Sequence, residues 1–233
     1  MKKPVKVLIN VGALQLQSAG IHVLVKELLQ ALHRESPQEL QLIPIGASKL
    51  IVKFPLLEFF RLFFWIPLQA WIHRVDWVVE PGHFGPFNLP SRIQRMTLIH
   101  DLTPILFPQW HNPLSARLQK WFFPLIFKKA HTIVCNSKYT AKDLKIHYPT
   151  TQSKIKVIYP GLSTAFIPSG KVPQSNKAPY ILMVSTLEPR KNLVNLLQAF
   201  ALVKRQTGYE GYQLILIGKM GWKTEKFKKA LQE

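Results

Sequence analysis

The sequence predicts an α/β protein built on a doubly wound parallel sheet, because short apolar runs alternate with helical patterns along most of its 233 residues. The apolar runs are continuous and do not alternate apolar with polar residues, which is typical of parallel strands covered by helices on both faces. Six runs occupy the first part of the chain: VKVLIN (5–10), LQLIPIG (40–46), VDWVVEP (75–81), MTLIHD (96–101), HTIVCNS (131–137) and KIKVIYPG (154–161).

Two helices between these strands have clear signals. In AGIHVLVKELLQALHRE the apolar side chains recur on one helical face, which predicts an amphipathic helix against the sheet. They are Ile21, Val25, Leu28, Leu29 and Leu32. In SKYTAKDLKIHY, Thr140 and Asp143 have the spacing of a capping box. This spacing predicts a helix that begins near Thr140 and a structural role for that threonine.

Residues 51–75, IVKFPLLEFFRLFFWIPLQAWIHRV, form a segment rich in aromatic side chains. Charged residues interrupt it, and its charge-free runs from Phe54 onward are too short to span a bilayer, which needs roughly 20 helical residues. Its polar residues recur at helical spacing and predict a narrow polar stripe. They are Glu58, Arg61, Gln69 and His73. The pattern fits a core helix packed on the sheet or, alternatively, a helix that dips into a membrane interface.

Pro, Gly and Ser accumulate over residues 163–178, which predicts a linker between a domain at 1–162 and a second domain at 179–233. The second domain has a predicted strand (180–186), helix (192–206), strand (212–218) and helix (224–232). Two βα units are too few for a whole doubly wound domain. We therefore expect either a fragment of a longer chain or an abridged second domain.

The composition favours a folded, basic protein with an anionic partner. A hydrophobic content of 47% with 18% charged residues excludes a disordered chain. The formal charge of +19 favours a nucleotide, a nucleic acid or an acidic membrane surface as partner. Residues 1–115 hold 11 basic and 7 acidic side chains and residues 116–233 hold 20 and 5, so the second half carries the excess.

Cysteine usage and the N-terminus predict a cytoplasmic protein. Cys135 is the only cysteine, so no internal disulfide can form, and its apolar surroundings predict a core residue. The apolar run after Met1 is too short for a signal peptide.

The stretch LEPRKN (187–192) stands between the apolar run YILMVST and the amphipathic run NLVNLLQAFALVKRQ. Arg190 and Lys191 therefore lie at a predicted helix N-terminus, where unpaired N–H groups and the helix dipole attract an anion such as phosphate. Paired basic residues in a loop are also often only solvated charge. These six residues alone favour neither interpretation.

Six motifs follow one another on this βα frame: GIHVLVKELLQAL (20–32), LIHDLTPILFP (98–108), IVCNSKYTAKDL (133–144), KIKVIYPGL (154–162), VSTLEPRKNLVNLLQAF (184–200) and LILIGKMGWK (214–223). In this order they resemble the retaining GT-B glycosyltransferases called glycosyl transferases group 1, which include many bacterial mannosyltransferases. The resemblance implies one complete Rossmann-like domain that holds the acceptor and the first part of a second. A UDP- or GDP-hexose donor would bind in the cleft between them, and the acceptor would be a saccharide or lipid-linked.

The resemblance implies that Arg190 and Lys191 hold the donor diphosphate. Cations already in place stabilise the charge that grows on the leaving diphosphate, so no metal or other cofactor is expected. No acidic cluster has the spacing of a Mg²⁺ or Mn²⁺ site, which agrees with that expectation. Gly12 and Gly20 stand where glycine either lets a ligand approach the backbone or simply serves a tight turn, and the resemblance favours contact with the donor. Ser18, in the same loop, is an implied acceptor-side contact.

His100 and Asp101 end the predicted fourth strand, where open α/β sheets bind ligands. The resemblance implies that His100 faces the transferred sugar and assists by a hydrogen bond, although a lone strand-end histidine is more often structural. Asp101 either orients His100 or caps the following turn. His83, in EPGHFGP, is an acceptor-side candidate.

The family carries a later pair of glutamates that grip the donor, and no such region precedes Glu233. Glu188 lies before the two cations and does not take the place of that pair. We therefore expect weak donor binding and little turnover by this chain alone.

A second hypothesis is a non-catalytic module that binds an anionic surface. Basic residues are dense in one stretch, and aromatic residues interleave with them: Lys120, Lys128, Lys129, Lys138, Lys142 and Lys145, with Trp121, Phe122 and Phe123. Such a belt suits nucleic acid or an anionic membrane that carries a lipid-linked acceptor. No nucleic-acid fold signature is present, which ranks peripheral attachment to the inner membrane face higher. A third hypothesis is a pseudoenzyme or truncated gene product.

Overall fold

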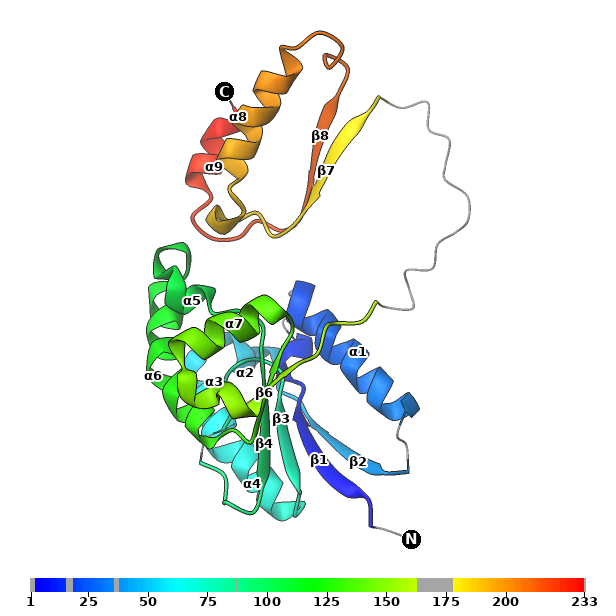
Figure 1. Ribbon diagram of the computed structural model, residues 1–233, viewed down its shortest axis with the longest axis vertical. Helices are drawn as coiled ribbons and strands as arrows, with labels where there is room; N and C mark the ends of the chain where they lie inside the picture. Colours follow the sequence, from blue (N-terminus) through cyan, green and yellow to red (C-terminus); the bar gives the residue numbers. More distant parts are fainter. Residues whose placement is uncertain (1–2, 16–18, 36–37, 87, 163–177, 233) are drawn as a thin grey trace. The chain divides into compact units, whose positions relative to one another are not determined.

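The computed structural model describes residues 3–15, 19–35, 38–86, 88–162 and 178–232 (Figure 1). The chain divides into two compact units, Met1–Phe166 and Ile167–Glu233. Except for Ala178, the predicted linker 163–178 lies outside the described residues, so the domain boundaries stay a prediction.

Unit 1 contains a six-stranded parallel sheet in the order β2-β1-β3-β4-β5-β6. The strands are β1 (Val5–Asn10), β2 (Leu40–Ile45), β3 (Trp77–Glu80), β4 (Gln94–Ile99), β5 (Thr132–Cys135) and β6 (Ile155–Val157). All six predicted strands are present, and most are shorter than predicted because their polar, Gly and Pro ends lie in loops. The predicted α/β class and parallel sheet are confirmed.

Helices cover both faces of this sheet (Figure 1). Along β1, Val7 and Ile9 pack with Val25 of α1 (Ala19–Glu35), whereas Leu8 between them packs with Leu62 on the opposite face. The remaining helical elements of unit 1 outside residues 49–72 are α5 (Thr103–Leu106), α6 (Pro113–Lys129), α7 (Lys138–His147) and the 3₁₀ turns Gly12–Gln15, Pro108–Trp110 and Pro149–Lys154. Side chains that alternate between two covered faces explain the continuous apolar runs.

The core beside β4 and β5 contains Cys135, which is fully buried. Burial raises the pKa of its thiol to about 11, so the thiol is protonated and unreactive at neutral pH. The predicted core role of Cys135 is confirmed.

The helix predicted to begin near Thr140 is present as α7, but the predicted capping residue is wrong. The helix begins at Lys138, and Ser137 is its N-cap, accepting a hydrogen bond from the Thr140 N–H at 3.0 Å. Thr140 is buried and donates its hydroxyl to the His100 carbonyl at 3.0 Å. Its role is structural, as predicted, through a different contact.

Residues 49–72 do not form one continuous helix. They form α2 (Lys49–Lys53), α3 (Pro55–Phe60), a π-helical turn (Arg61–Trp65) and α4 (Ile66–Ile72). Pro67 has no N–H to offer the Phe63 carbonyl, which accepts a hydrogen bond from the Asn88 side chain instead. The Ile66 N–H bonds the Arg61 carbonyl, the longer spacing of a π-bulge.

One face of this helical segment packs on the sheet, as the interpretation as a core helix requires. Leu62, Phe63, Ile66 and Ala70 lie in the core with Leu8 and Val78. The predicted polar stripe is wrong at Arg61, which is only 5% exposed. Instead, the outer face is apolar and exposes Leu56, Phe60, Phe64, Trp65, Leu68, Trp71 and Ile72.

Unit 2 is a pair of βα units. It contains β7 (Tyr180–Val184), a 3₁₀ turn (Pro189–Lys191), α8 (Leu193–Lys204), β8 (Gln213–Ile217) and α9 (Glu225–Ala230). The two strands are parallel, and both predicted strands and both predicted helices are confirmed. Leu187, Leu193 and Phe227 form its buried core.

Candidate functional site

In unit 1 the sheet order places a topological switch point at β1. The chain passes from β1 to β2 on one side of it and then crosses back to β3 on the other side. In open α/β sheets, ligands bind beyond the carboxyl ends of the strands that flank this point. The residues at these ends are polar: Asn10 ends β1 and Glu80 ends β3. They therefore mark the expected binding edge.

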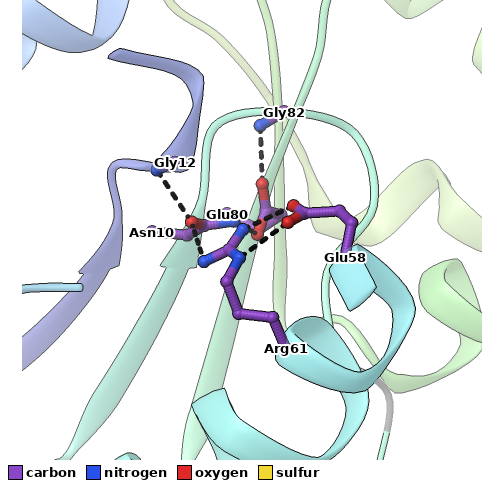
Figure 2. Close-up of polar contacts among 6 residues, drawn as sticks. All are labelled: Asn10, Gly12, Glu58, Arg61, Glu80 and Gly82. Atoms are coloured by element: carbon purple, nitrogen blue, oxygen red, sulfur yellow. Dashed lines mark hydrogen bonds and ion pairs between the residues drawn. The ribbon is translucent and has the colours of Figure 1, made fainter. Parts of the chain in front are cut away.

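Six residues at this edge form a hydrogen-bonded polar cluster (Figure 2). Arg61 is its centre: its guanidinium donates to both carboxylate oxygens of Glu58, at 2.8 and 2.6 Å, and to Asn10 Oδ1 at 2.9 Å. Asn10 donates to Glu80 at 2.6 Å. Backbone N–H groups complete it, with Gly12 donating to Asn10 at 3.0 Å and Gly82 to Glu80 at 2.8 Å. The cluster thus ties the loops after β1 and β3 to the π-bulge.

Glu80 is the titratable member of this cluster near neutral pH. It is 3% exposed, and burial raises the pKa of its carboxyl to about 7. Hydrogen bonds from Asn10 and Gly82 and the charge of Arg61 oppose that rise, whereas the Glu58 charge adds to it. The side chain that fixes the Gly82 loop therefore exchanges a proton at physiological pH.

Gly12 allows the Arg61 guanidinium to approach the backbone. A Cβ at this position would lie 2.7 Å from Arg61 Nη2 and 3.2 Å from Asn10 Oδ1. The structure therefore supplies a reason for glycine within the chain itself. A donor contact at Gly12 stays a prediction.

Two histidines lie together beside this cluster, at the ends of β3 and β4. The rings of His83 and His100 stack with centroids 4.8 Å apart. The His100 N–H donates to His83 Nε2 at 3.1 Å, so this nitrogen carries no proton. His100 Nε2 lies 2.7 Å from the Pro81 carbonyl, which can only accept, so Nε2 carries the His100 proton. His100 Nδ1 is then the ring nitrogen that can accept a hydrogen bond from a ligand.

His83 is held neutral in a constrained conformation. Burial and the neighbouring His100 lower the pKa of its imidazole to about 3, against the smaller opposing effect of Asp101. Its backbone φ is 74°, in the left-handed region that non-glycine residues rarely adopt. Its ring contacts to His100 hold it there, which is typical of residues fixed at a site.

Asp101 caps the turn that follows it, one of the two roles left open by the sequence. Its carboxylate accepts the Thr103 N–H at 3.0 Å and the Thr103 hydroxyl at 2.6 Å, which holds the start of α5. A catalytic role for Asp101 stays a prediction.

The structure brings His83 and His100 together and places Gly12, which follows β1, at the same edge of the unit 1 sheet. Gly20 lies in the first turn of α1 with open space around its Cα. Ser18 lies outside the described residues.

The cluster residues Asn10, Glu58, Arg61 and Glu80 were not predicted as a group. The available signal was a polar residue at the last position of two buried strands.

In unit 2, Arg190 is fixed by a neighbouring carboxylate. Glu188 Oε1 accepts from Arg190 Nε at 2.9 Å and lies 2.7 Å from Nη2. The Glu188 side chain is 3% exposed and that of Arg190 31%, so a buried acid orients a partly exposed cation. Lys191 follows and ends the 3₁₀ turn. The two cations thus lie in a turn before α8, which begins at Leu193, one residue later than predicted.

Asn192 separates this turn from α8. It adopts a left-handed conformation with φ 56°, and its side chain makes no capping hydrogen bond to the helix. The first N–H groups of α8 therefore have no side-chain cap at Asn192 and stand directly after the two cations.

Two glycines hold the loop after β8 against the loop that carries these cations. A Cβ on Gly218 would lie 1.6 Å from the Ser185 carbonyl oxygen, and one on Gly221 would lie 3.0 Å from the Leu187 oxygen. The Leu187 N–H donates to the Lys219 carbonyl at 2.9 Å. Close backbone packing therefore positions the Glu188–Arg190 pair.

The aromatic part of the predicted basic belt is corrected by the structure. Phe123 is fully buried in the core and Phe122 packs against it, so neither is available to stack on bases. Trp121 is exposed.

Comparison with known families identifies what these two units are. The model described as Glycosyltransferase Family 4 matches residues 13–166, which span both histidines and most of the polar cluster. The chain belongs to glycosyltransferase family 4. A second model, Glycosyl transferases group 1, matches residues 169–233, which contain the Glu188–Arg190 pair. The predicted resemblance to GT-B glycosyltransferases is thereby confirmed.

Curated relatives of this family 4 chain are mannosyltransferases of Escherichia coli. O-antigen chain mannosyltransferase B is 28% identical over 166 residues, which cover 67% of this chain and 43% of that protein. Serotype-specific mannosyltransferase WbdA is 26% identical over 145 residues, 55% of this chain and 18% of that protein. The chain spans less than half the length of each of these relatives.

Two further properties of the family 4 chain concern metals and membranes. Among its described residues, no group of three or more His, Cys, Asp or Glu side chains is placed to hold a metal ion. Within the same residues, every helix is too short or too polar to cross a bilayer.

Proposed function

We propose that this protein acts in the transfer of mannose, with retention of anomeric configuration, from a nucleotide-linked donor to a saccharide or lipid-linked acceptor. The observation that carries the proposal is the match of both family models, in order, to the two units. The names of the relatives supply the sugar. GDP-mannose is the donor we would test first and a UDP-hexose the second.

In the proposed reaction, unit 2 holds the donor diphosphate. Arg190 can donate to phosphate oxygens from a fixed position, because Glu188 already holds one edge of its guanidinium. Lys191 and the first N–H groups of α8 add positive charge beside it. As the bond from the anomeric carbon to the diphosphate breaks, these groups stabilise the growing negative charge without a metal.

In unit 1, His100 contacts the sugar. Its Nδ1 accepts a hydrogen bond from a hydroxyl, because Nε2 is committed to the Pro81 carbonyl. Neutral His83 and the Thr140 hydroxyl fix the His100 backbone from two sides. We assign His83 to the acceptor side of the site.

The test for the donor site is binding of GDP and UDP by calorimetry to the wild type and to Arg190→Gln/Lys191→Gln. We expect the variant to bind at least about tenfold more weakly, because two charge-assisted contacts are lost. Lys226→Gln/Lys228→Gln, on the exposed side of α9, removes the same charge and should bind as the wild type does. Equal losses in both variants would contradict the assigned site.

The test for the reaction is transfer of labelled mannose from GDP-mannose, with and without EDTA, with the anomeric configuration of the product read by NMR. Transfer by this chain alone is expected to be slow; EDTA should not slow it further, and the product should retain the anomeric configuration. Inversion, or a requirement for a divalent ion, would overturn the corresponding part of the proposal.

We also propose that unit 1 docks on an anionic membrane surface, where a lipid-linked acceptor resides. The outer face of α3, the π-turn and α4 exposes large apolar side chains, among them Phe64, Trp65 and Trp71. Phe63 stacks on Phe122 of α6, so this face lies beside a helix that carries exposed Lys120 and Trp121. Apolar residues flanked by cations suit a headgroup interface. Sedimentation with anionic and neutral vesicles tests it, and equal binding to both would oppose it.

A further inference from the structure

A basic pocket opens at the edge of the unit 1 sheet opposite the histidines. It has a volume of about 560 Å³ and is lined at the amino ends of β3, β4 and β5 and at the end of α6. Five of its ten lining residues are basic: Arg95, Lys128, Lys129, His131 and Lys154. Its other lining residues are neutral, so the pocket contains no carboxylate to balance these charges.

Part of this basic character has an internal explanation. Lys154 Nζ donates to the Phe127 and Lys128 carbonyls, both at 3.0 Å, and Arg95 Nη1 donates to the Lys129 carbonyl at 3.1 Å. These contacts satisfy the final carbonyls of α6, and cations are favourable at a helix C-terminus. Two of the five basic side chains are therefore held in place by structural bonds that leave their charge unneutralised.

The other three have hydrogen-bonding groups directed to solvent or the pocket. Lys128 and Lys129 are exposed, and among the described residues their ammonium groups make no ion pair. The Arg95 N–H donates to His131 Nδ1 at 3.1 Å, so neutral His131 carries its proton on Nε2 and can donate it. Burial, and to a lesser extent the charges of Arg95 and Lys154, lower the pKa of His131.

We propose that this pocket binds a phosphate group, with Lys128, Lys129 and His131 as its donors and Arg95 and Lys154 as fixed charges behind them. The volume accommodates a diphosphate or a phospholipid headgroup. Three exposed apolar residues of α6, Leu114, Trp121 and Leu125, lie on one helical face. The same face continues to the pocket residue Lys128, since successive spacings are seven, four and three residues. This stripe favours a lipid as the source of the phosphate. The inference does not depend on the transfer reaction.

The test uses inorganic pyrophosphate, followed by calorimetry and by the His131 ring resonances in NMR. Saturable binding that moves the His131 signals is expected. In Lys128→Gln/Lys129→Gln the affinity should fall by about tenfold or more, since two charge-assisted contacts are lost. Lys142→Gln/Lys145→Gln removes two exposed cations of α7 outside the pocket and serves as the matched control. Both variants change only exposed side chains and should melt as the wild type does.

Soluble short-chain phosphatidate identifies the source of the phosphate. If it displaces pyrophosphate and binds more tightly, and if only the pocket variant loses affinity for phosphatidate vesicles, the ligand is a lipid headgroup. If pyrophosphate binds and phosphatidate does not displace it, the ligand is a soluble phosphate. Equal losses in the pocket and control variants, or saturation without movement of the His131 signals, would overturn the site.

Discussion

At the scale of single residues, Glu80 and His83 give unit 1 opposite responses to pH. Glu80 has a folded pKa of about 7 against an ordinary value of 4.5, so between these values the folded chain retains a proton that the unfolded chain releases. Stability from this group therefore falls as pH rises through that window. His83 has a folded pKa of about 3 against 6.5, so its contribution is lost as pH falls from 6.5 towards 3.

We predict that the two responses separate in variants. In the wild type, the free energy of unfolding should fall as the pH rises from 4.5 to 7, because folded Glu80 keeps its proton. Glu80→Gln cannot titrate, so the difference in unfolding free energy between variant and wild type should change by on the order of 3 kcal/mol over this pH range. Urea unfolding at several pH values, followed by tryptophan fluorescence, measures this, because five of the six tryptophans precede residue 163. A constant difference at all pH values would show that Glu80 does not titrate there.

The same measurement on His83→Gln should show a variant that resists acid better than the wild type does. Glutamine can accept the His100 N–H through its oxygen and cannot become charged. Parallel pH profiles for His83→Gln and wild type would mean that His83 is not the buried neutral group described above.

Removal of Arg61 should destabilise unit 1. Arg61→Met takes away the Arg61 donors of the Glu58 carboxylate, whereas Asn10 Oδ1 still accepts from the Gly12 N–H. Because Glu58 is partly exposed and the lost hydrogen bonds are charge-assisted, we expect a cost of roughly 1.5–3 kcal/mol. The double variant Glu58→Met/Arg61→Met removes both charges and should recover part of the loss. If it is less stable than Arg61→Met, the pair is not the cause.

At the scale of elements, the π-bulge depends on a proline and an asparagine distant in sequence. Pro67 frees the Phe63 carbonyl, and Asn88 donates to it. We predict that Asn88→Ala costs about 1 kcal/mol in the wild type and much less when Pro67→Ala restores a helical N–H. Urea unfolding of both single variants and the double variant gives the coupling free energy. Additive effects would disprove the exchange of partners.

The strands could be predicted because apolar runs are local signals, whereas this bulge could not. Helical spacing placed Arg61 with Glu58, Gln69 and His73 on one stripe, but its partner Asn10 lies 51 residues away. Likewise, capping-box spacing at Thr140 did not reveal that Ser137 has the better position to cap α7. Only the folded sheet creates the contact between Arg61 and Asn10, and the choice between two hydroxyl residues three positions apart as the cap of α7 is finer than a spacing pattern decides.

The candidate site was predictable to the extent that it lies at strand ends. His83, His100, Arg190 and Lys191 all follow strands, where parallel sheets bind ligands. The burial of the two acids was not predictable: Glu80 ends a predicted strand and Glu188 lies in a predicted loop, and neither position reveals that the side chain is enclosed by residues distant in sequence.

At the scale of the whole molecule, the basic excess of residues 116–233 and the apolar face of α3–α4 should make separable contributions to the membrane binding that we propose. We predict that Phe64→Ser/Trp71→Ser weakens binding to anionic vesicles by about tenfold at every salt concentration, because burial of apolar area is insensitive to screening. Raised salt should weaken vesicle binding by the wild type, because it screens the contribution of the basic residues. Tyr139→Ser/Ile146→Ser removes exposed apolar side chains from α7 and should bind normally. Equal loss in both variants would contradict a defined docking face.

The Arg61 cluster also has a consequence for how the chain folds. The guanidinium is stripped of water only where β1 has already brought Asn10 to the π-bulge. Asn10 and Arg61 are 51 residues apart in the sequence. Closing this loop and burying the Arg61 charge is unfavourable until its hydrogen-bond partners are in place, so the cluster should assemble after the folding transition state. Kinetically, Arg61→Met should then accelerate unfolding and leave the folding rate nearly unchanged. The contacts of the buried arginine would thus form late in folding and would set the unfolding rate of unit 1.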